Sequence, residues 1–200
     1  MPRKLTRYAY SALFLIALCA VVYVLISAGN GTPNRAPFEK YARGELAGLS
    51  FDTRGDAAPT DSFEGPDGQS TTLQAFQGKP ILVNFWATWC APCEKEMPAL
   101  GALQTARGGE NFQIVAISVD GEEDKAYARQ RLTELGASNI PFHYAAPENW
   151  DIVYAAGAKG FPTTVIYDAG GKEVARLSGD ADWASIEAVG FIDALIAAAP

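Results

Sequence analysis

Two cysteines with two residues between them are the part of this sequence that predicts chemistry. Cys90 and Cys93 closely follow residues 81–86, an apolar run that is typical of a buried strand. A strand that leads into Cys-x-x-Cys at the start of a helix is a layout for thiol–disulfide exchange. The N–H groups at a helix N-terminus carry partial positive charge, which favours a thiolate at the first cysteine. We therefore predict that Cys90 attacks a disulfide and that Cys93, one helical turn later, resolves the mixed disulfide.

Other uses of the cysteine pair need features that the sequence has only in part. A structural zinc site takes about four cysteine or histidine ligands. The chain has three cysteines and one histidine, and Cys19 lies far away in an N-terminal apolar run. A disulfide that only staples the fold usually closes a longer loop. Two soft thiolates can hold Cu(I), so a Cu(I)-binding module is the main alternative from another class. For the exchange reaction itself we expect neither a metal nor a cofactor.

The elements that must position the cysteines alternate between strands and helices. Apolar runs and turn signals predict strands at 62–64, 71–73, 81–86, 112–119, 141–144, 163–167 and 173–177. Helical patterns fall at 38–49, 91–105, 122–135, 150–156 and 183–198. This order predicts an α/β fold in which helices cover a mixed sheet.

The first residues indicate a membrane anchor. Residues 8–27 are uncharged and mostly apolar, and Arg3, Lys4 and Arg7 precede them. A run of about 20 such residues can cross a bilayer as one helix, and basic flanking residues favour a cytoplasmic N-terminus. We therefore expect a cytoplasmic tail at 1–7, a transmembrane helix at 8–27, a linker with a short helix at 28–47 and an exported domain at 48–200. A cleaved signal peptide or a lipid on Cys19 fits the pattern less well, because the run is long and Leu18 precedes the cysteine.

The charge of the chain argues against nucleic acid as a partner. It has 16 basic and 23 acidic residues, for a net charge of −7. All of the acidic residues lie after position 35, so the expected domain is more acidic than the whole chain. Nucleic-acid-binding domains carry basic patches instead.

Four separated segments resemble one family. Residues 83–98, VNFWATWCAPCEKEMP, resemble the active-site segment of TlpA-like proteins, which are membrane-anchored thioredoxin-like reductases of the bacterial periplasm. Residues 73–80, 160–164 and 179–185 are similar to further segments of that family, in the same order. The likeness covers roughly residues 48–198. It implies a thioredoxin-like fold with an extra N-terminal hairpin and the β-α insertion of the TlpA/ResA/CcmG branch, because Pro162 lies well beyond Cys93.

The resemblance also implies roles for residues outside the cysteine pair. Pro162 matches the cis-proline that faces the disulfide in thioredoxin-like folds, and Phe161 and Thr163 beside it are expected to contact substrate. Glu96 matches a glutamate that tunes cysteine acidity and assists proton transfer, although it could also be a solvated helix residue. Asn84 stands where thioredoxin has a buried acid, and an amide cannot titrate in its place.

Aromatic and proline residues are expected around the disulfide. Pro92 suits the first helical turn because it needs no N–H partner. Trp86 is expected to pack in the core, and Trp89 either packs there or offers an apolar surface to partners. Core positions are also expected for Trp150, Trp183 and His143.

The function that these features predict is reduction of disulfides in exported proteins. By analogy with the family, the substrates would belong to cytochrome oxidase copper-site or cytochrome c biogenesis, and a membrane thiol carrier of the CcdA or DsbD type would supply electrons. The enzyme would sit in the bacterial inner membrane with its domain in the periplasm. The alternatives are a CcmG-like reductase dedicated to apocytochrome c and the Cu(I)-binding module. An oxidase is disfavoured because Ala91 and Pro92 cannot stabilise the thiolate as a histidine does. A peroxiredoxin is disfavoured because Ala87 stands where its threonine would be.

Overall fold

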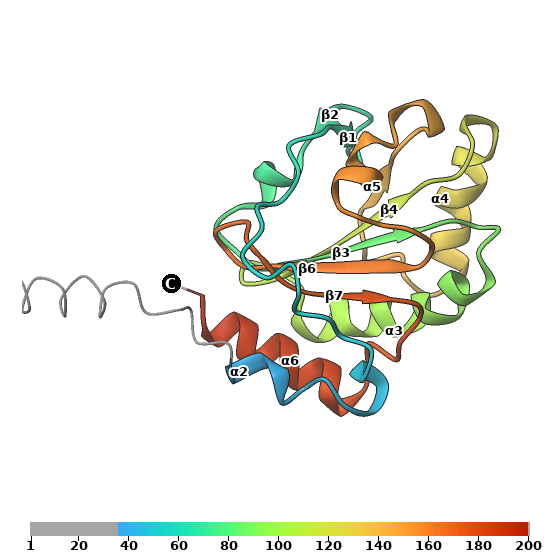
Figure 1. Cartoon of the computed structure of the whole chain (residues 1–200). Coiled ribbons are helices and arrows are strands. Elements are labelled where there is room, and N and C mark those ends of the chain that lie inside the picture. Colours follow the sequence, from blue (N-terminus) through green and yellow to red (C-terminus); the bar gives the residue numbers. More distant parts are fainter. Residues whose placement is uncertain (1–35, 200) are drawn as a thin grey trace, which may run out of the picture. The chain divides into compact units, whose positions relative to one another are not determined.

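A mixed sheet of seven strands organises residues 36–199, which are the residues that the computed structural model describes (Figure 1). The spatial order of the strands is β2-β1-β5-β4-β3-β6-β7. Their bounds are Phe63–Glu64 for β1, Ser70–Thr71 for β2, Ile81–Trp86 for β3, Gln113–Ser118 for β4, Phe142–Tyr144 for β5, Thr163–Tyr167 for β6 and Glu173–Ser178 for β7.

Strand β3 lies inside the sheet between β4 and β6, and all six of its side chains are buried. It runs parallel to β4 and antiparallel to β6. Such a strand is apolar on both faces, which explains why its sequence does not alternate. Its register pairs Phe85 with Thr163, so the end of β3 lies beside the beginning of β6. The segment that leads from β3 to Cys90 and the segment with Pro162 that leads into β6 therefore lie at the same end of these two strands.

The described part of the chain contains five α-helices: α2 at Ala36–Glu39, α3 at Ala91–Arg107, α4 at Lys125–Glu134, α5 at Asp151–Ala155 and α6 at Ile186–Ala197. Short 3-10 turns lie at Gly44–Leu46, Leu73–Phe76, Glu122–Asp124 and Pro147–Asn149. Figure 1 shows α6 alongside α3, where Arg107 pairs with Asp193. On α4, Arg131 pairs with Glu94 of α3 at 2.6 Å. Helix α4 leads to strand β5, which pairs with β4 and β1.

The α/β class and the mixed sheet are confirmed, but three predicted helices begin or end three or more residues away from the predicted positions. The predicted helix at 38–49 is broken after Glu39, and Gly44 adopts φ +55°, which a right-handed helix cannot continue. The predicted helix at 183–198 begins only at Ile186, because the Ser185 hydroxyl caps it by accepting the Ala188 N–H. The predicted helix at 122–135 starts as a 3-10 turn.

The predicted tail at 1–7, the anchor at 8–27 and linker residues up to 35 lie outside the described residues. Within residues 36–199, none of the helices has the length and apolar character needed to cross a membrane.

Candidate active site

The two cysteines form a disulfide where β3 leads into α3. Their sulfurs are 2.02 Å apart. Cys90 is the N-cap of α3, and its sulfur accepts the Cys93 backbone N–H at 3.3 Å. Cys90 is 6% exposed, whereas Cys93 is fully buried. Cys90 is therefore the more accessible cysteine for a thiolate from outside, and the helix N–H groups stabilise negative charge on its sulfur.

A buried aspartate fixes the loop between β3 and Cys90. The Asp120 carboxylate accepts the Thr88 backbone N–H at 3.0 Å and the Thr88 hydroxyl at 2.7 Å. The Ser118 hydroxyl donates to its other oxygen at 2.8 Å. Asp120 is not among the residues predicted from the sequence, although an acidic residue close to the end of a buried strand is a signal that could have indicated it. This carboxylate ties the end of β4 to the approach to Cys90.

The Phe161–Pro162 peptide bond is cis and lies in the loop before β6. The loop is held by Thr163, whose hydroxyl donates to the Gly160 carbonyl at 2.7 Å, and by the Gly179 N–H, which donates to the Pro162 carbonyl at 2.9 Å. Within the described residues, the backbone N–H and C=O of Phe161 have no backbone hydrogen-bond partner. They are therefore available to an added extended segment.

Aromatic side chains extend from the disulfide along the surface. The Trp89 ring meets the Phe161 ring edge-on at 5.7 Å, Phe161 meets Trp150 at 5.9 Å, and Trp150 meets Tyr154 at 6.3 Å. We call these four residues the aromatic row. Trp89 is 61% exposed and Tyr154 is 67% exposed. Trp150 thus belongs to this row, in addition to packing against the core as predicted. Trp86 is fully buried in the core.

Glu96 lies inside the protein, so the alternative of a solvated helix glutamate is wrong. Its side chain is on α3, and the residue is 2% exposed. Three donors converge on its carboxylate: the Asn84 Nδ2 at 2.7 Å, the Trp183 indole N–H at 2.9 Å and the Ala181 backbone N–H at 3.2 Å. Burial raises the pKa of Glu96 from its ordinary value of 4.5 to about 7, and the three hydrogen bonds oppose this rise.

Trp183 has a function in this cluster that its predicted role as a packing residue omits. It is fully buried, but its indole N–H is directed at Glu96. The segment at 179–185 matched the family motif, yet nothing in the sequence relates it to position 96. Only the packing of the turn before α6 against α3 brings the two together.

The remaining predicted residues lie near the disulfide or in the core. Pro92 occupies the first turn of α3, where its missing N–H costs nothing. His143 is buried between Phe63 and Phe76, with both rings edge-on at 5.7 Å. Burial lowers the pKa of His143 to about 4, so the imidazole is neutral near pH 7.

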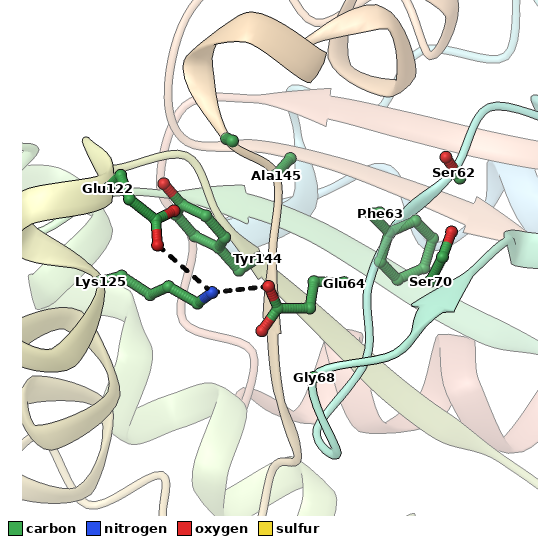
Figure 2. A pocket seen from close by; sticks show the side chains of 10 residues that line it. Ser62, Phe63, Glu64, Gly68, Ser70, Glu122, Lys125, Tyr144 and Ala145 are labelled. Atoms are coloured by element: carbon green, nitrogen blue, oxygen red, sulfur yellow. Dashed lines mark hydrogen bonds and ion pairs between the residues drawn. The ribbon is translucent and has the colours of Figure 1, made fainter.

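A separate pocket of about 330 Å³ lies beside β1 and β5, and none of the predicted site residues lines it. Figure 2 shows Lys125 in this pocket between two carboxylates, with its ammonium 2.6 Å from Glu64 and 3.7 Å from Glu122. The same ammonium lies over the Tyr144 ring at 4.8 Å. The lysine charge is therefore already balanced by neighbours. Among residues 36–199, no group of three or more His, Cys, Asp or Glu side chains is arranged to hold a metal ion.

Fold and site together define a dithiol oxidoreductase of thioredoxin-like fold. The family model described as Redoxin matches residues 53–189, and the chain therefore belongs to the redoxin family. Its relatives belong to the TlpA/ResA/CcmG branch, which confirms the resemblance and makes this protein a thiol:disulfide oxidoreductase.

Three comparisons illustrate the similarity. Thiol-disulfide oxidoreductase ResA of Bacillus thuringiensis subsp. konkukian is 27% identical over 180 residues, which cover 88% of this chain and 91% of the relative. A crystal structure of a Chlorobium tepidum protein, described as a candidate thiol:disulfide interchange protein DsbE, has a TM-score of 0.61 at 26% identity and covers 74% of this chain and 99% of its own. The solution structure of a thiol:disulfide interchange protein from Bacteroides sp. has a TM-score of 0.60 at 27% identity, with 73% and 91% coverage.

Proposed function

We propose that this oxidoreductase works as a reductase of disulfides in exported proteins. The observation that carries the proposal is the asymmetry of the cysteine pair, in which Cys90 is slightly exposed at 6% and Cys93 is fully buried. In the reduced enzyme, the Cys90 thiolate attacks a substrate disulfide and forms a mixed disulfide, and the first substrate sulfur leaves as a thiol after taking a proton. The Cys93 thiol then loses its proton and attacks the Cys90 sulfur. The second substrate thiol is released, and the enzyme ends as the disulfide.

Glu96 is the group that we propose to accept the Cys93 proton in the second step. It follows Cys93 by three residues on α3, which places both side chains on one face of the helix. A carboxyl whose pKa is about 7 takes up and releases a proton close to neutral pH. His143 is the one histidine of the sequence, and it lies among phenylalanine rings. Glu96 is therefore better placed than His143 to act as the base.

The aromatic row is the surface that we propose to bind the substrate beside its disulfide. Exposed tryptophan and tyrosine side chains dominate the free energy of many protein interfaces. The unpaired backbone of Phe161 lies within the row and offers one N–H and one C=O to an extended substrate segment.

Replacing Trp89 by alanine is expected to raise KM for a protein disulfide about five- to thirtyfold, because about 1–2 kcal/mol of contact free energy is lost. Reduction of a small disulfide such as 5,5′-dithiobis(2-nitrobenzoate) should change little. Tyr127→Ala, which removes a half-exposed tyrosine on α4, is the matched control. Equal losses with both kinds of substrate would show that Trp89 serves the cysteine pair and not substrate binding.

The cellular setting that we propose is the bacterial inner membrane, with the catalytic domain in the periplasm. The apolar run at 8–27 and its basic flank support this orientation. A membrane thiol carrier of the CcdA or DsbD type would return electrons to Cys90 and Cys93. The substrates would be proteins of cytochrome oxidase copper-site assembly or apocytochromes c, and a dedicated apocytochrome reductase of the CcmG type is the narrower form of the same proposal.

The reduction potential of the cysteine pair tests the direction of electron flow. The pair is equilibrated with reduced and oxidised glutathione, and the fraction of disulfide is measured at each ratio. We expect a potential closer to the value of about −270 mV for thioredoxin than to the value of about −120 mV for DsbA. A value near that of DsbA would make the protein an oxidant and overturn the proposal.

An insulin-reduction assay beside a Cu(I) competition titration separates the reductase from the Cu(I)-binding module. The reductase catalyses insulin reduction with a thiol donor. A copper carrier binds Cu(I) tightly through the two thiolates and gives no turnover.

A further inference from the structure

The three donors around Glu96 differ in what they can do when the carboxyl gains a proton. The Trp183 indole N–H and the Ala181 backbone N–H both donate to Oε2, and neither group can accept a hydrogen bond. A proton on Oε2 would therefore face two donors. The remaining oxygen, Oε1, accepts only from the Asn84 side chain, at 2.7 Å. An amide carries an acceptor at its other end, so Asn84 alone can adapt to a protonated Glu96.

Asn84 makes a second contact that can reverse in the same way. Its Nδ2 also donates to the Thr164 hydroxyl at 3.0 Å, across the β3–β6 pair in which the two residues are register partners. A hydroxyl is both donor and acceptor. If the amide rotates by half a turn, its Oδ1 can accept from the protonated Oε1 and from the Thr164 hydroxyl together.

The part of the Asn84 amide that faces away from Glu96 does not favour either of the two amide orientations. Asn84 Oδ1 is buried without a hydrogen-bond partner among the described residues. After rotation, the NH2 group occupies that place and lacks the same partner. Each orientation thus leaves one end unsatisfied, and the protonation of Glu96 decides between them.

We propose that Asn84 is a positioning residue whose side-chain amide turns over when Glu96 gains or loses its proton, with the Thr164 hydroxyl reversing its hydrogen bond at the same time. The amide donates to the carboxylate and accepts from the carboxylic acid. Glu96 thereby keeps a hydrogen bond at Oε1 in both forms, which suits a buried group that must cycle between them. Turnover uses this rearrangement only if Glu96 has the proposed role in the reaction, whereas the rearrangement itself needs only titration of the carboxyl.

A pocket borders Glu96, and neither cysteine lines it. This pocket of about 290 Å³ is lined by Glu96 together with Lys95, Asp180, Glu45 and Asp182. Lys95 and Asp180 pair at its edge, 2.6 Å apart. These charges, and the Cys93 sulfur one turn earlier on α3, are the groups that face Glu96. They affect the pH at which it titrates, but none of them hydrogen-bonds to Oε1.

Nuclear magnetic resonance of the disulfide form of the full chain tests the proposal without any substrate. Asparagine side chains are labelled with 15N and glutamate carboxyls with 13C, and the Asn84 signal is assigned as the one lost in Asn84→Ala. We expect nuclear Overhauser contacts from the Asn84 amide protons to the Thr164 side chain at high pH and their loss at low pH. The midpoint should coincide with that of the Glu96 carboxyl.

Two controls and two contrary outcomes make the test decisive. In Glu96→Gln, the Asn84 amide signal should no longer move with pH. In Glu110→Gln, which changes an exposed loop residue, the transition should persist. Amide contacts that stay the same while Glu96 titrates would overturn the proposal, as would a Glu96 carboxyl that does not titrate between pH 5 and 9. Neither outcome depends on the direction of electron flow, so the reductase proposal is judged separately.

Discussion

Cys90→Ser is expected to reduce insulin-reduction activity by at least about a thousandfold, because the attacking sulfur is lost. Cys93→Ser should lose turnover to a similar degree but should accumulate a mixed disulfide on Cys90. The reason for the difference is exposure, since Cys90 is slightly exposed and Cys93 is fully buried. Serine is close in shape to cysteine, so neither variant should disturb the first turn of α3.

The mixed disulfide is detected by non-reducing electrophoresis, with mass spectrometry to identify the trapped partner. Both variants should carry Cys19→Ser, so that the third cysteine of the chain cannot form adducts. The double variant Cys90→Ser/Cys93→Ser is the blank. If Cys90→Ser traps partners as efficiently as Cys93→Ser, the assignment of attacking and resolving sulfur is wrong.

Glu96→Gln is expected to change the pH dependence of stability by about 3 kcal/mol between pH 4.5 and 8. Burial raises the pKa of Glu96 from 4.5 to about 7, so the folded protein holds a proton that the unfolded chain releases. The contribution of this group to the free energy of unfolding is therefore complete below pH 4.5 and is lost as the pH rises through 7. Glutamine cannot titrate, and the variant should lack this loss.

His143 makes the comparison between variants necessary. Burial lowers its pKa from 6.5 to about 4, so its contribution is lost as the pH falls below 6.5. The two slopes partly cancel in the wild type, and the difference between wild type and Glu96→Gln isolates the carboxyl. Urea unfolding of the disulfide form at a series of pH values measures it, with Glu110→Gln as the control. Parallel curves for wild type and Glu96→Gln would show that Glu96 titrates near its ordinary value.

The reactive pair and much of the frame around it follow from local sequence patterns. Cys-x-x-Cys after an apolar run is a local pattern, since the strand, the turn and the first helical turn that place Cys90 involve neighbours in the chain. The cis bond before Pro162 could be expected only through the resemblance, because cis bonds are a small minority at proline. Helix ends are harder to predict than helices, because they depend on single residues such as Gly44 and Ser185.

The hydrogen bonds of the buried carboxyl and the surroundings of the disulfide depend on tertiary contacts. Glu96 receives hydrogen bonds from β3 and from the turn before α6, and Asp120 holds a loop 32 residues earlier in the chain. The aromatic row likewise joins Trp89 to Phe161 and Trp150, which come from separate elements. Each of these contacts links residues that are distant in sequence. The type of a side chain does not indicate which distant residue it will contact. Periodicity and local motifs predict elements, whereas the packing of those elements sets the protonation and exposure on which the chemistry depends.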